Sequence, residues 1–217
     1  MASPPASSPR RLRGRTVFLA IVGVIVVLVV PTVVFPTILF PPDPPAFTDD
    51  APLPAFALTD HTGRAFTQAE LAGHVTIVNF IFTRCDSVCP RSSMKMHGVQ
   101  ERTDDEPSIK LISITIDPDH DTVPVLAEYA ATFRADPTRW RFVRGEPAAT
   151  RALIEGAMMV GYDKVGTLRS GAPDISHSGH FVLIDRRGHL RGYYDSDDDG
   201  RIETLLRHAR WLARQRS

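Results

Sequence analysis

The sequence predicts an α/β domain in which helices cover both faces of one sheet, a three-layer α/β/α sandwich. Three apolar runs carry this prediction, at residues 75–82, 111–116 and 181–184. Each run is rich in β-branched or aromatic residues and has the length of a strand that is buried on both faces. Helical patterns lie between the runs, so strands and helices alternate until a closing hairpin and a C-terminal helix.

The first half of the domain begins with a predicted β-hairpin. Residues 56–59 and 65–67 flank the turn sequence Asp-His-Thr-Gly, and a turn of this kind between two strand-like segments is typical of a hairpin. The expected elements that follow are a helical turn at 68–72, the strand at 75–82, a helix that ends near residue 101, and the strand at 111–116.

The second half contains two helices with clear sequence signals. Thr122 and Pro124 indicate the start of a helix over residues 123–134, because threonine can cap a helix and proline suits its first turn. Residues 201–215 have one apolar stripe and predict an amphipathic helix. The other expected elements are a strand at 140–143, a helix at 147–160, a long loop at 161–176, and strands at 181–184 and 190–194.

The N-terminal residues predict a membrane anchor. Residues 16–40 form a stretch of 25 positions without a charged residue, which is long enough to span a bilayer. Four arginines precede it, so we expect residues 1–15 to be cytoplasmic and the rest of the chain extracytoplasmic. A cleaved signal peptide is the alternative, but the run is long for one and no convincing Ala-x-Ala site follows it.

A proline-rich tether at residues 41–54 joins this anchor to a folded domain over residues 52–217. Proline-rich segments are extended and semi-rigid. The domain is long enough for one proper hydrophobic core. The whole chain has 25 basic and 25 acidic residues, and this balance gives no support to nucleic-acid binding.

Cys85 and Cys89 are the only cysteines in the 217 residues, and they lie where the first buried strand meets a helix. Residues four apart at the start of a helix share one face, so two sulfurs there can form a disulfide or converge on one metal ion. The helix N-terminus favours thiolate over thiol, and a thiolate pair selects soft ions such as Cu(I), or Zn(II). Two buried structural cysteines are the alternative, although such residues have no reason to cluster at this turn.

Three motifs in order resemble those of the Sco/SenC family. They are Cys-x3-Cys-Pro at residues 85–90, Asp-Pro-x-x-Asp-Thr at 117–122, and His-Ser at 177–178 before Phe-Val-Leu-Ile-Asp. The resemblance covers roughly residues 52–212. It implies a thioredoxin-like fold tethered to a membrane, in a protein that serves assembly of the copper centre of cytochrome c oxidase.

The resemblance also implies a ligand set for copper, namely Cys85, Cys89 and His177. Asp86 stands where a proline is common in the family, a departure that removes no ligand. His180 follows the His-Ser motif closely and is a second candidate for the histidine ligand. Cu(I) would be held by two thiolates and one imidazole, and Cu(II) would need a further ligand that the sequence does not identify.

The implied function is therefore that of a copper metallochaperone, which delivers copper to the oxidase or maintains the thiols of its copper centre. The implied partners are the copper-centre subunit of cytochrome c oxidase, other copper chaperones or thiol reductases, and the membrane through the N-terminal helix. The implied location is the cell (inner) membrane, with a single pass and an extracytoplasmic or periplasmic C-terminal domain.

The alternative is an enzyme, a thiol–disulfide oxidoreductase with Cys85 as the attacking thiolate and Cys89 as the resolving thiol. A peroxidase is a further alternative, indicated by Thr83 near Cys85, but the proline-containing signature of that class is missing.

Other side chains are candidates for secondary roles. Met94, Met96 and His97 could form a soft metal site, or Met96 could pack in the core. Asp117 could orient a ligand or simply form a turn before Pro118. Residues 195–200 resemble the start of a calcium loop, but its twelfth position lacks the bidentate glutamate, so a solvated turn is expected.

Overall fold

The structure is a computed structural model that describes residues 14, 17–19, 21–25, 51–85, 88–167, 173–177 and 179–215, with residues 163–167 and 173–177 described by their backbone alone. The chain divides into two compact units, Met1–Asp43 and Pro44–Ser217. In the first unit, residues 17–19 and 21–25 are helical and exposed. No helix within the described part of the chain is long and apolar enough to cross a membrane. Most of the predicted anchor and tether lies outside that part.

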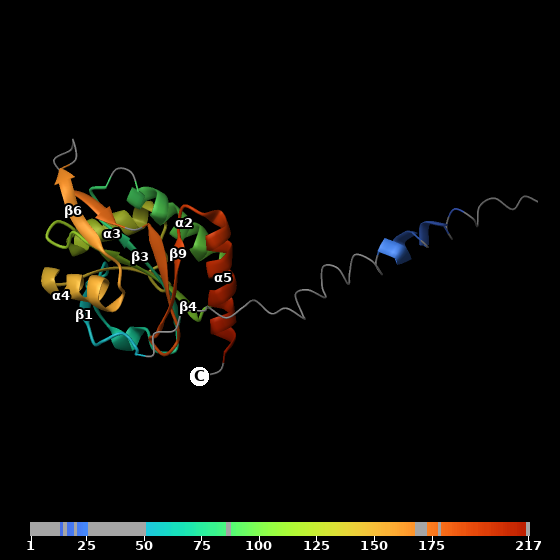
Figure 1. Cartoon of the computed structure of the whole chain (residues 1–217), viewed down its shortest axis with the longest axis horizontal. Coiled ribbons are helices and arrows are strands. Elements are labelled where there is room, and N and C mark those ends of the chain that lie inside the picture. The colour runs from blue at the N-terminus through green and yellow to red at the C-terminus, as the bar shows by residue number, and fades with distance from the viewer. Residues whose placement is uncertain are drawn as a thin grey trace, which may run out of the picture. The chain divides into compact units, whose positions relative to one another are not determined.

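The described strands of the second unit form a seven-stranded mixed sheet in the order β2-β1-β5-β4-β3-β8-β9 (Figure 1). The three central strands β3, β4 and β5 are parallel, and antiparallel strands extend the sheet on both sides. Two further strands, β6 and β7, form a separate antiparallel hairpin. The strands are β1 (Ala57–Asp60), β2 (Ala65–Thr67), β3 (Val75–Ile81), β4 (Ile109–Thr115), β5 (Trp140–Arg144), β6 (Tyr162–Thr167), β7 (Pro173–His177), β8 (His180–Ile184) and β9 (Leu190–Asp195).

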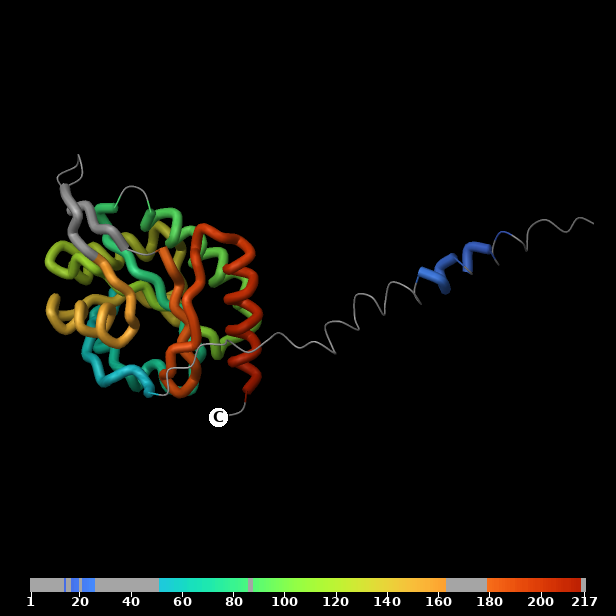
Figure 2. The backbone as a smooth tube through the Cα atoms, in the orientation of Figure 1, coloured from blue at the N-terminus to red at the C-terminus, as the bar shows by residue number. Residues whose placement is uncertain are grey.

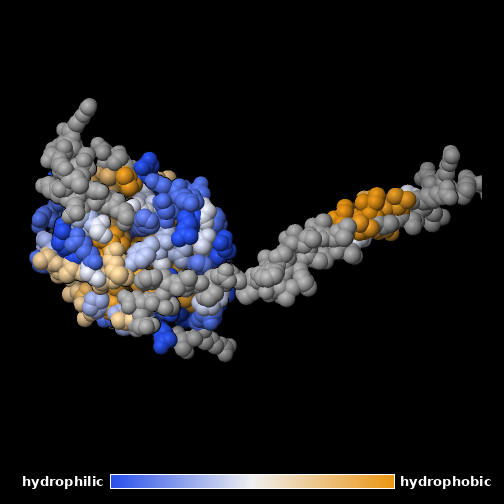
Figure 3. All heavy atoms as spheres, in the orientation of Figure 1, coloured by the Kyte–Doolittle hydropathy of each residue, from blue (hydrophilic) through white to orange (hydrophobic). Residues whose placement is uncertain are grey.

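Helical segments connect these strands and close the domain. They are η1 (Gln68–Glu70), α2 (Val88–Arg102), α3 (Val123–Thr132), α4 (Pro147–Arg151), η2 (Ala152–Ala157) and α5 (Asp199–Arg214). The last helix begins where the Asp198 carboxylate accepts hydrogen bonds from the backbone N–H groups of Gly200 and Arg201, which satisfies two donors that a helix start leaves unpaired. Its predicted apolar stripe is buried, while hydrophilic side chains cover its outer surface (Figure 3).

Two consecutive tyrosines of β9 show that the sheet is covered on both faces. Successive side chains of a strand point to opposite faces. The Tyr194 hydroxyl lies 2.6 Å from Nδ1 of His208 on α5, whereas the Tyr193 hydroxyl donates to the Met158 carbonyl at the end of η2. Helices therefore pack on both faces, and the predicted three-layer α/β/α architecture is confirmed. Figure 2 shows the closing strands β8 and β9 running beside β3 and α5.

The central strands hold the core, and their few polar groups bond to one another. Every residue of β3 is buried, as its apolar run predicts. Asn79 of β3 donates from Nδ2 to the Ser92 hydroxyl on α2 at 3.2 Å and accepts from the Ser113 hydroxyl at 2.6 Å. Trp140 of β5 donates from Nε1 to the same Ser113 oxygen at 2.9 Å. This buried chain of hydrogen bonds joins three strands and fixes α2 on the sheet.

The predicted loop at residues 161–176 is wrong, because the structure forms the β6–β7 hairpin there. This two-stranded ribbon is not part of the seven-stranded sheet, so its strands need no apolar run, and the sequence accordingly shows none. The helix predicted at 147–160 divides into the short α-helix α4 and the π-helical η2. Thr122 occupies the N-cap position of α3 as predicted, but its side chain makes no capping hydrogen bond.

Candidate metal centre

The two cysteines lie close together at the turn between β3 and α2. The Cys85 backbone N–H donates to the Phe82 carbonyl at 3.2 Å, which tightens the chain directly after the strand. Cys89 is the second residue of α2, and its backbone N–H donates to the Cys85 Sγ at 3.4 Å. Cys85 is 9% exposed and Cys89 is fully buried. The structure holds the two cysteines without a disulfide between them, and Cys85 is the more exposed residue of the pair.

The two sulfurs differ in their affinity for a proton. A hydrogen bond to Cys85 and burial both raise the pKa of the Cys89 thiol above its ordinary value. For Cys89 this outcome corrects the expectation that the helix N-terminus favours the thiolate, since desolvation opposes charge more strongly than the helix dipole favours it. Negative charge is better stabilised on the Cys85 sulfur, which accepts the hydrogen bond from the Cys89 N–H.

A buried carboxylate holds the chain just before Cys85. Asp121 is fully buried, and it accepts hydrogen bonds from the Thr83 backbone N–H at 3.2 Å and from the Thr83 hydroxyl at 2.5 Å. It also accepts from the Thr115 hydroxyl at the end of β4. A buried carboxylate is stable only with such partners. Asp121 therefore ties the start of the cysteine turn to the neighbouring strand.

The residue directly before Cys85 is fixed by an ion pair. Arg84 donates from Nε and from a terminal guanidinium nitrogen to Oδ2 of Asp117, at 3.1 and 2.5 Å. The Asp117 carbonyl also accepts from the backbone N–H groups of His120 and Asp121. Asp117 thus forms the predicted turn, and its carboxylate holds Arg84 beside the cysteine pair.

Asp117, His120 and Asp121 offer ligand atoms that lie within 4.8 Å of one another, so this group could in principle hold a metal ion. The carboxylate oxygens already have protein partners, however. Asp117 is paired with Arg84, and Asp121 accepts from Thr83 and Thr115. The group therefore acts as a hydrogen-bonded support for the cysteine turn.

A tyrosine on α3 lies beside α2 one turn beyond Cys89. The Tyr129 hydroxyl lies 3.2 Å from the Ser93 hydroxyl. Burial raises the pKa of Tyr129, and negative charge on Cys89 and Cys85 would raise it further. The tyrosine is therefore neutral and supplies a polar group close to the sulfurs in a mostly apolar wall.

The two histidine candidates occupy the end of β7 and the start of β8. The His177 backbone pairs in register with Tyr162 of β6, while the His177 side chain and Ser178 lie outside the described part of the structure. His180 is the first residue of β8 and pairs with Asp195 of β9. Because β8 is antiparallel to β3, the start of β8 lies toward the end of β3 from which the cysteine turn follows.

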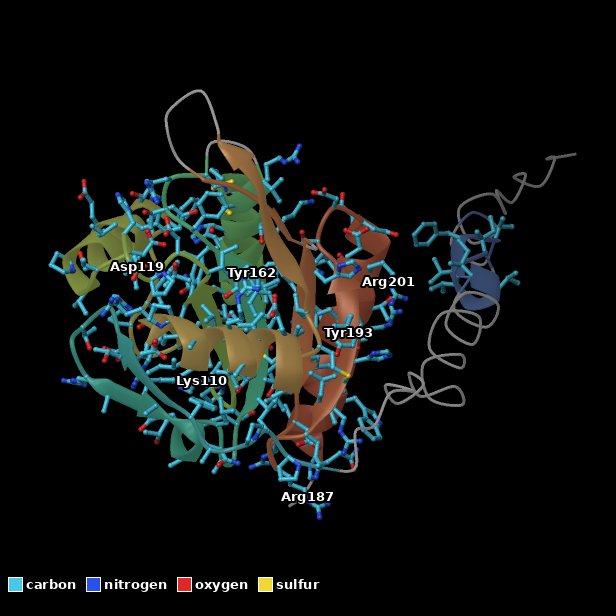
Figure 4. The ribbon with its side chains drawn as sticks, turned by 60° about the vertical axis from the view of Figure 1, so that its left-hand side comes forward. Lys110, Asp119, Tyr162, Arg187, Tyr193 and Arg201 are labelled. Carbon is cyan, nitrogen blue, oxygen red and sulfur yellow. The ribbon has the colours of Figure 1, made fainter. Side chains whose placement is uncertain are left out.

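The β6–β7 hairpin is held against the domain through Tyr162, which Figure 4 shows beside α4. Tyr162 is 8% exposed and belongs to the hydrophobic core. The Arg151 guanidinium of α4 lies over its ring, 4.6 Å from the ring centre. Cation–π contact and burial together fix one end of the strand that pairs with His177.

The other candidates from the sequence have structural roles in the described part of the chain. Met96 is fully buried in the core, while Met94 is 59% exposed. His97 lies 3.4 Å from the Glu101 carboxylate on the outside of α2. These positions do not bring the two methionines and the histidine together. In the calcium-like segment, Asp198 caps α5 and Asp197 is exposed, which is the expected solvated turn.

Four residues of the site have supporting roles that the sequence does not predict. Thr83 indicates only a peroxidase, and Arg84 and Tyr129 belong to no motif. Asp121 is part of the Asp-Pro-x-x-Asp-Thr motif, which assigns it no role. The available signal was the occurrence of polar residues directly after two neighbouring parallel strands, since the ends of such strands meet at one edge of a sheet.

Comparisons with known proteins agree with this geometry. The sequence model of the SCO1/SenC family matches residues 48–214. A SCO2-like protein of Rickettsia typhi is 34% identical over 161 residues, which are 71% of this chain and 75% of that protein. The SCO1 protein homolog of Bacillus subtilis is 24% identical over 152 residues, with 70% of this chain and 77% of that protein covered.

Solved structures support the same assignment. The structure of Bradyrhizobium japonicum ScoI with copper bound is 28% identical and has a TM-score of 0.64, and the match covers 75% of this chain and all of that one. The site and fold define a thioredoxin-like α/β protein with a cysteine pair after its central strand. The chain belongs to the SCO1/SenC family.

Proposed function

We propose that this protein is a copper metallochaperone that binds copper through Cys85, Cys89 and His177 and serves the copper centre of cytochrome c oxidase. The observation that carries the proposal is the contact between the two cysteines, in which the Cys89 N–H lies 3.4 Å from the Cys85 Sγ. This hydrogen bond closes the turn between the two cysteines, and two soft sulfur donors in one turn suit Cu(I). Support also comes from ScoI, a relative whose structure has copper bound, and from a Bacillus Sco protein described as a member of a family of oxidase assembly proteins.

The strand register supports His177 as the third ligand. β8 pairs antiparallel with β3 through Ile184 with Thr76 and Val182 with Val78. Because the two strands are antiparallel, the start of β8 lies toward the end of β3 from which the cysteine turn follows, and His177 ends the strand directly before β8.

The unequal sulfurs suit a protein that passes its metal on. Copper binding must displace the proton that the metal-free Cys89 holds. This proton competes with copper for the sulfur and therefore favours release of the metal to a partner. Cys85 keeps a small exposed surface, so an incoming thiolate of a partner can attack the metal from this side. Copper is then cargo that moves by ligand exchange, and no net redox change is needed.

We also propose that residues 16–40 anchor the protein in the cell (inner) membrane, with residues 41–54 as a tether and residues 52–217 as the extracytoplasmic domain. The support is the uncharged run that follows four arginines. A reporter enzyme fused after Ser217 should be active only when it folds outside the cytoplasm. Activity of a cytoplasmic reporter at the same position would reject both the orientation and the delivery role.

The copper proposal is tested by competition with a Cu(I) chelator under anaerobic conditions, using the purified full chain in a non-ionic detergent. His177→Ala should weaken Cu(I) binding by orders of magnitude, because two thiolates alone leave the ion open to competing donors. His180→Ala is the matched control and should change binding much less. If His180→Ala shows the loss instead, the chaperone proposal stands and the ligand assignment fails. If neither variant loses affinity, the three-ligand site is rejected.

A thiol–disulfide oxidoreductase is the second candidate, because one accessible and one buried sulfur are the arrangement of an attacking and a resolving thiol. The Cys85 thiolate would attack a partner disulfide and release one partner thiolate. Cys89 would then attack the mixed disulfide, so that the partner gains two electrons and two protons while Cys85 and Cys89 become a disulfide. This chemistry needs no histidine ligand, so His177→Ala should leave disulfide reduction largely intact.

A further inference from the structure

A second polar site lies at the opposite edge of the sheet from the cysteines. A cavity of about 160 Å³ is lined by the first residues of the central parallel strands. Thr76 and Lys110 lie near the starts of β3 and β4, and Arg139 and Arg141 lie at the start of β5. Because the cysteine turn follows the other end of β3, the two sites are separated by about the length of the strand, roughly 20 Å.

Positive charge dominates the lining of this cavity. Lys110, Arg139 and Arg141 contribute three cations, and Glu70 is the carboxylate that faces them. Arg141 is already engaged, with Asp60 at 3.3 Å and Glu70 at 3.5 Å. Arg139 donates to the carbonyls of Gln100 and Thr103 at the C-terminal end of α2. These contacts fix both guanidinium groups in place.

Lys110, like Arg139, makes no ion pair with a carboxylate of the described residues, and unlike both guanidinium groups it makes only one polar contact with those residues. Its Nζ donates to the Thr138 carbonyl at 3.0 Å, and no carboxylate of the described residues lies within ion-pair distance of it. Burial and the neighbouring Arg139 lower the pKa of Lys110, as expected for an ammonium group in a partly desolvated, positive environment. Lys110 is labelled in Figure 4.

Buried polar atoms around the same cavity lack hydrogen-bond partners. Thr76 is fully buried, and its Oγ1 has no partner among the described residues. The same holds for Nδ1 of His74 and Nε of Arg139, both of which are buried atoms of lining residues. Unpartnered buried polar atoms are rare in folded proteins, and a bound ion or ordered water is one common explanation.

We propose that this cavity binds a small oxyanion of the phosphate class, with Lys110 as its charged partner and Thr76 as a hydroxyl donor. The volume is below that of pockets for drug-sized ligands, which favours an ion over a nucleotide. Phe66, Leu111 and Ile112 supply an apolar part of the wall, and a low dielectric strengthens the attraction between the ammonium group and an anion. The phosphate group could be free inorganic phosphate or belong to the headgroup of an anionic lipid.

The experiment measures thermal unfolding and calorimetric binding of the full chain in a non-ionic detergent. Inorganic phosphate should raise Tm saturably, by about 5 °C at saturation relative to chloride of equal ionic strength. Lys110→Gln should weaken phosphate binding at least tenfold. Lys95→Gln removes the same charge on the outer surface of α2 and should bind phosphate like the wild type. Thr76→Val keeps the side-chain shape and should weaken binding without unfolding the domain.

The sources of the phosphate group are separated with glycerol phosphate, a soluble form of a lipid headgroup. Binding that is as tight as that of inorganic phosphate and equally sensitive to Lys110→Gln assigns the cavity to a headgroup. Binding of inorganic phosphate alone assigns it to the free ion. The proposal is overturned if neither probe binds saturably, or if Lys110→Gln and Thr76→Val both bind the probes as tightly as the wild type.

Discussion

Asp121 accepts two hydrogen bonds from Thr83, one from the backbone N–H and one from the hydroxyl group. These residues are 38 positions apart in the chain, and Thr83 lies two positions before Cys85. The carboxylate therefore fixes the geometry of the cysteine turn from the segment that follows the neighbouring strand β4. Hydrogen-bonded groups of this kind behind metal ligands are often needed for full metal affinity.

Asp121→Asn should weaken Cu(I) binding by about 10- to 100-fold, which is the usual cost of losing a group that orients metal ligands. The amide would bring a donor toward the Thr83 N–H and hydroxyl, so at least one of these hydrogen bonds would be lost. Competition with a Cu(I) chelator measures the affinity, and circular dichroism checks the fold. Asp119→Asn, at an exposed position nearby, is the control and should bind copper normally. An unchanged affinity in Asp121→Asn would show that the turn holds without the carboxylate.

The two cysteines should differ in their rate of alkylation. Cys85 has exposed surface and Cys89 has none, so iodoacetamide should modify Cys85 several-fold faster at neutral pH. Peptide mass spectrometry after short reaction times measures the order. In Cys85→Ser the remaining thiol should react slowly, and in Cys89→Ser it should react readily. Equal rates in the reduced wild type would contradict the described burial of Cys89.

The methionines of α2 provide a matched pair for stability. Met96 is fully buried and Met94 is 59% exposed. Met96→Ala should lower the free energy of unfolding by about 3 kcal/mol, because it leaves a cavity in the core. Met94→Ala should change that free energy by less than about 0.5 kcal/mol, as is usual for surface sites. Urea unfolding measures both changes. A loss of copper affinity in a folded Met94→Ala variant would indicate that Met94 contributes to a secondary metal site.

Asp185 should contribute to stability in a pH-dependent way. Burial alone would raise its pKa, but backbone N–H groups of His189 and Arg187, together with the Arg191 guanidinium at 2.6 Å, lower that pKa below its ordinary value. A lowered pKa in the folded state gives stability that is present above the unfolded pKa of about 3.9 and is lost as the pH falls through the folded pKa.

We therefore expect Asp185→Asn to lower the free energy of unfolding by about 3 kcal/mol at pH 7. The wild type should lose stability below about pH 4, and the variant should lose less of it over the same range. Urea unfolding between pH 3 and pH 7 measures the difference. Parallel pH profiles for the variant and the wild type would mean that this carboxylate is not linked to folding.

Local sequence patterns are sufficient to predict the central strands, the C-terminal helix and the position of the two cysteines. The apolar runs predict the central strands because a strand buried on both faces must be apolar throughout. Cys85 and Cys89 lie at a strand-to-helix turn for a local reason, since the end of one element and the start of the next are only a few residues apart. The stripe of α5 is likewise local, because helical periodicity alone places its apolar residues on one face.

The distant groups that contact the cysteine turn follow from the tertiary structure. Asp121 reaches Thr83 because β3 and β4 are parallel neighbours, and their ends therefore meet at one edge. The β6–β7 hairpin has little sequence signal because its strands are not part of the main sheet and therefore carry no apolar run. The raised pKa of Cys89 also depends on the tertiary structure. The helix position favours a thiolate, whereas the neighbouring Cys85 sulfur and burial favour the thiol. Local sequence describes chain periodicity, whereas burial and contact depend on what the rest of the chain brings nearby.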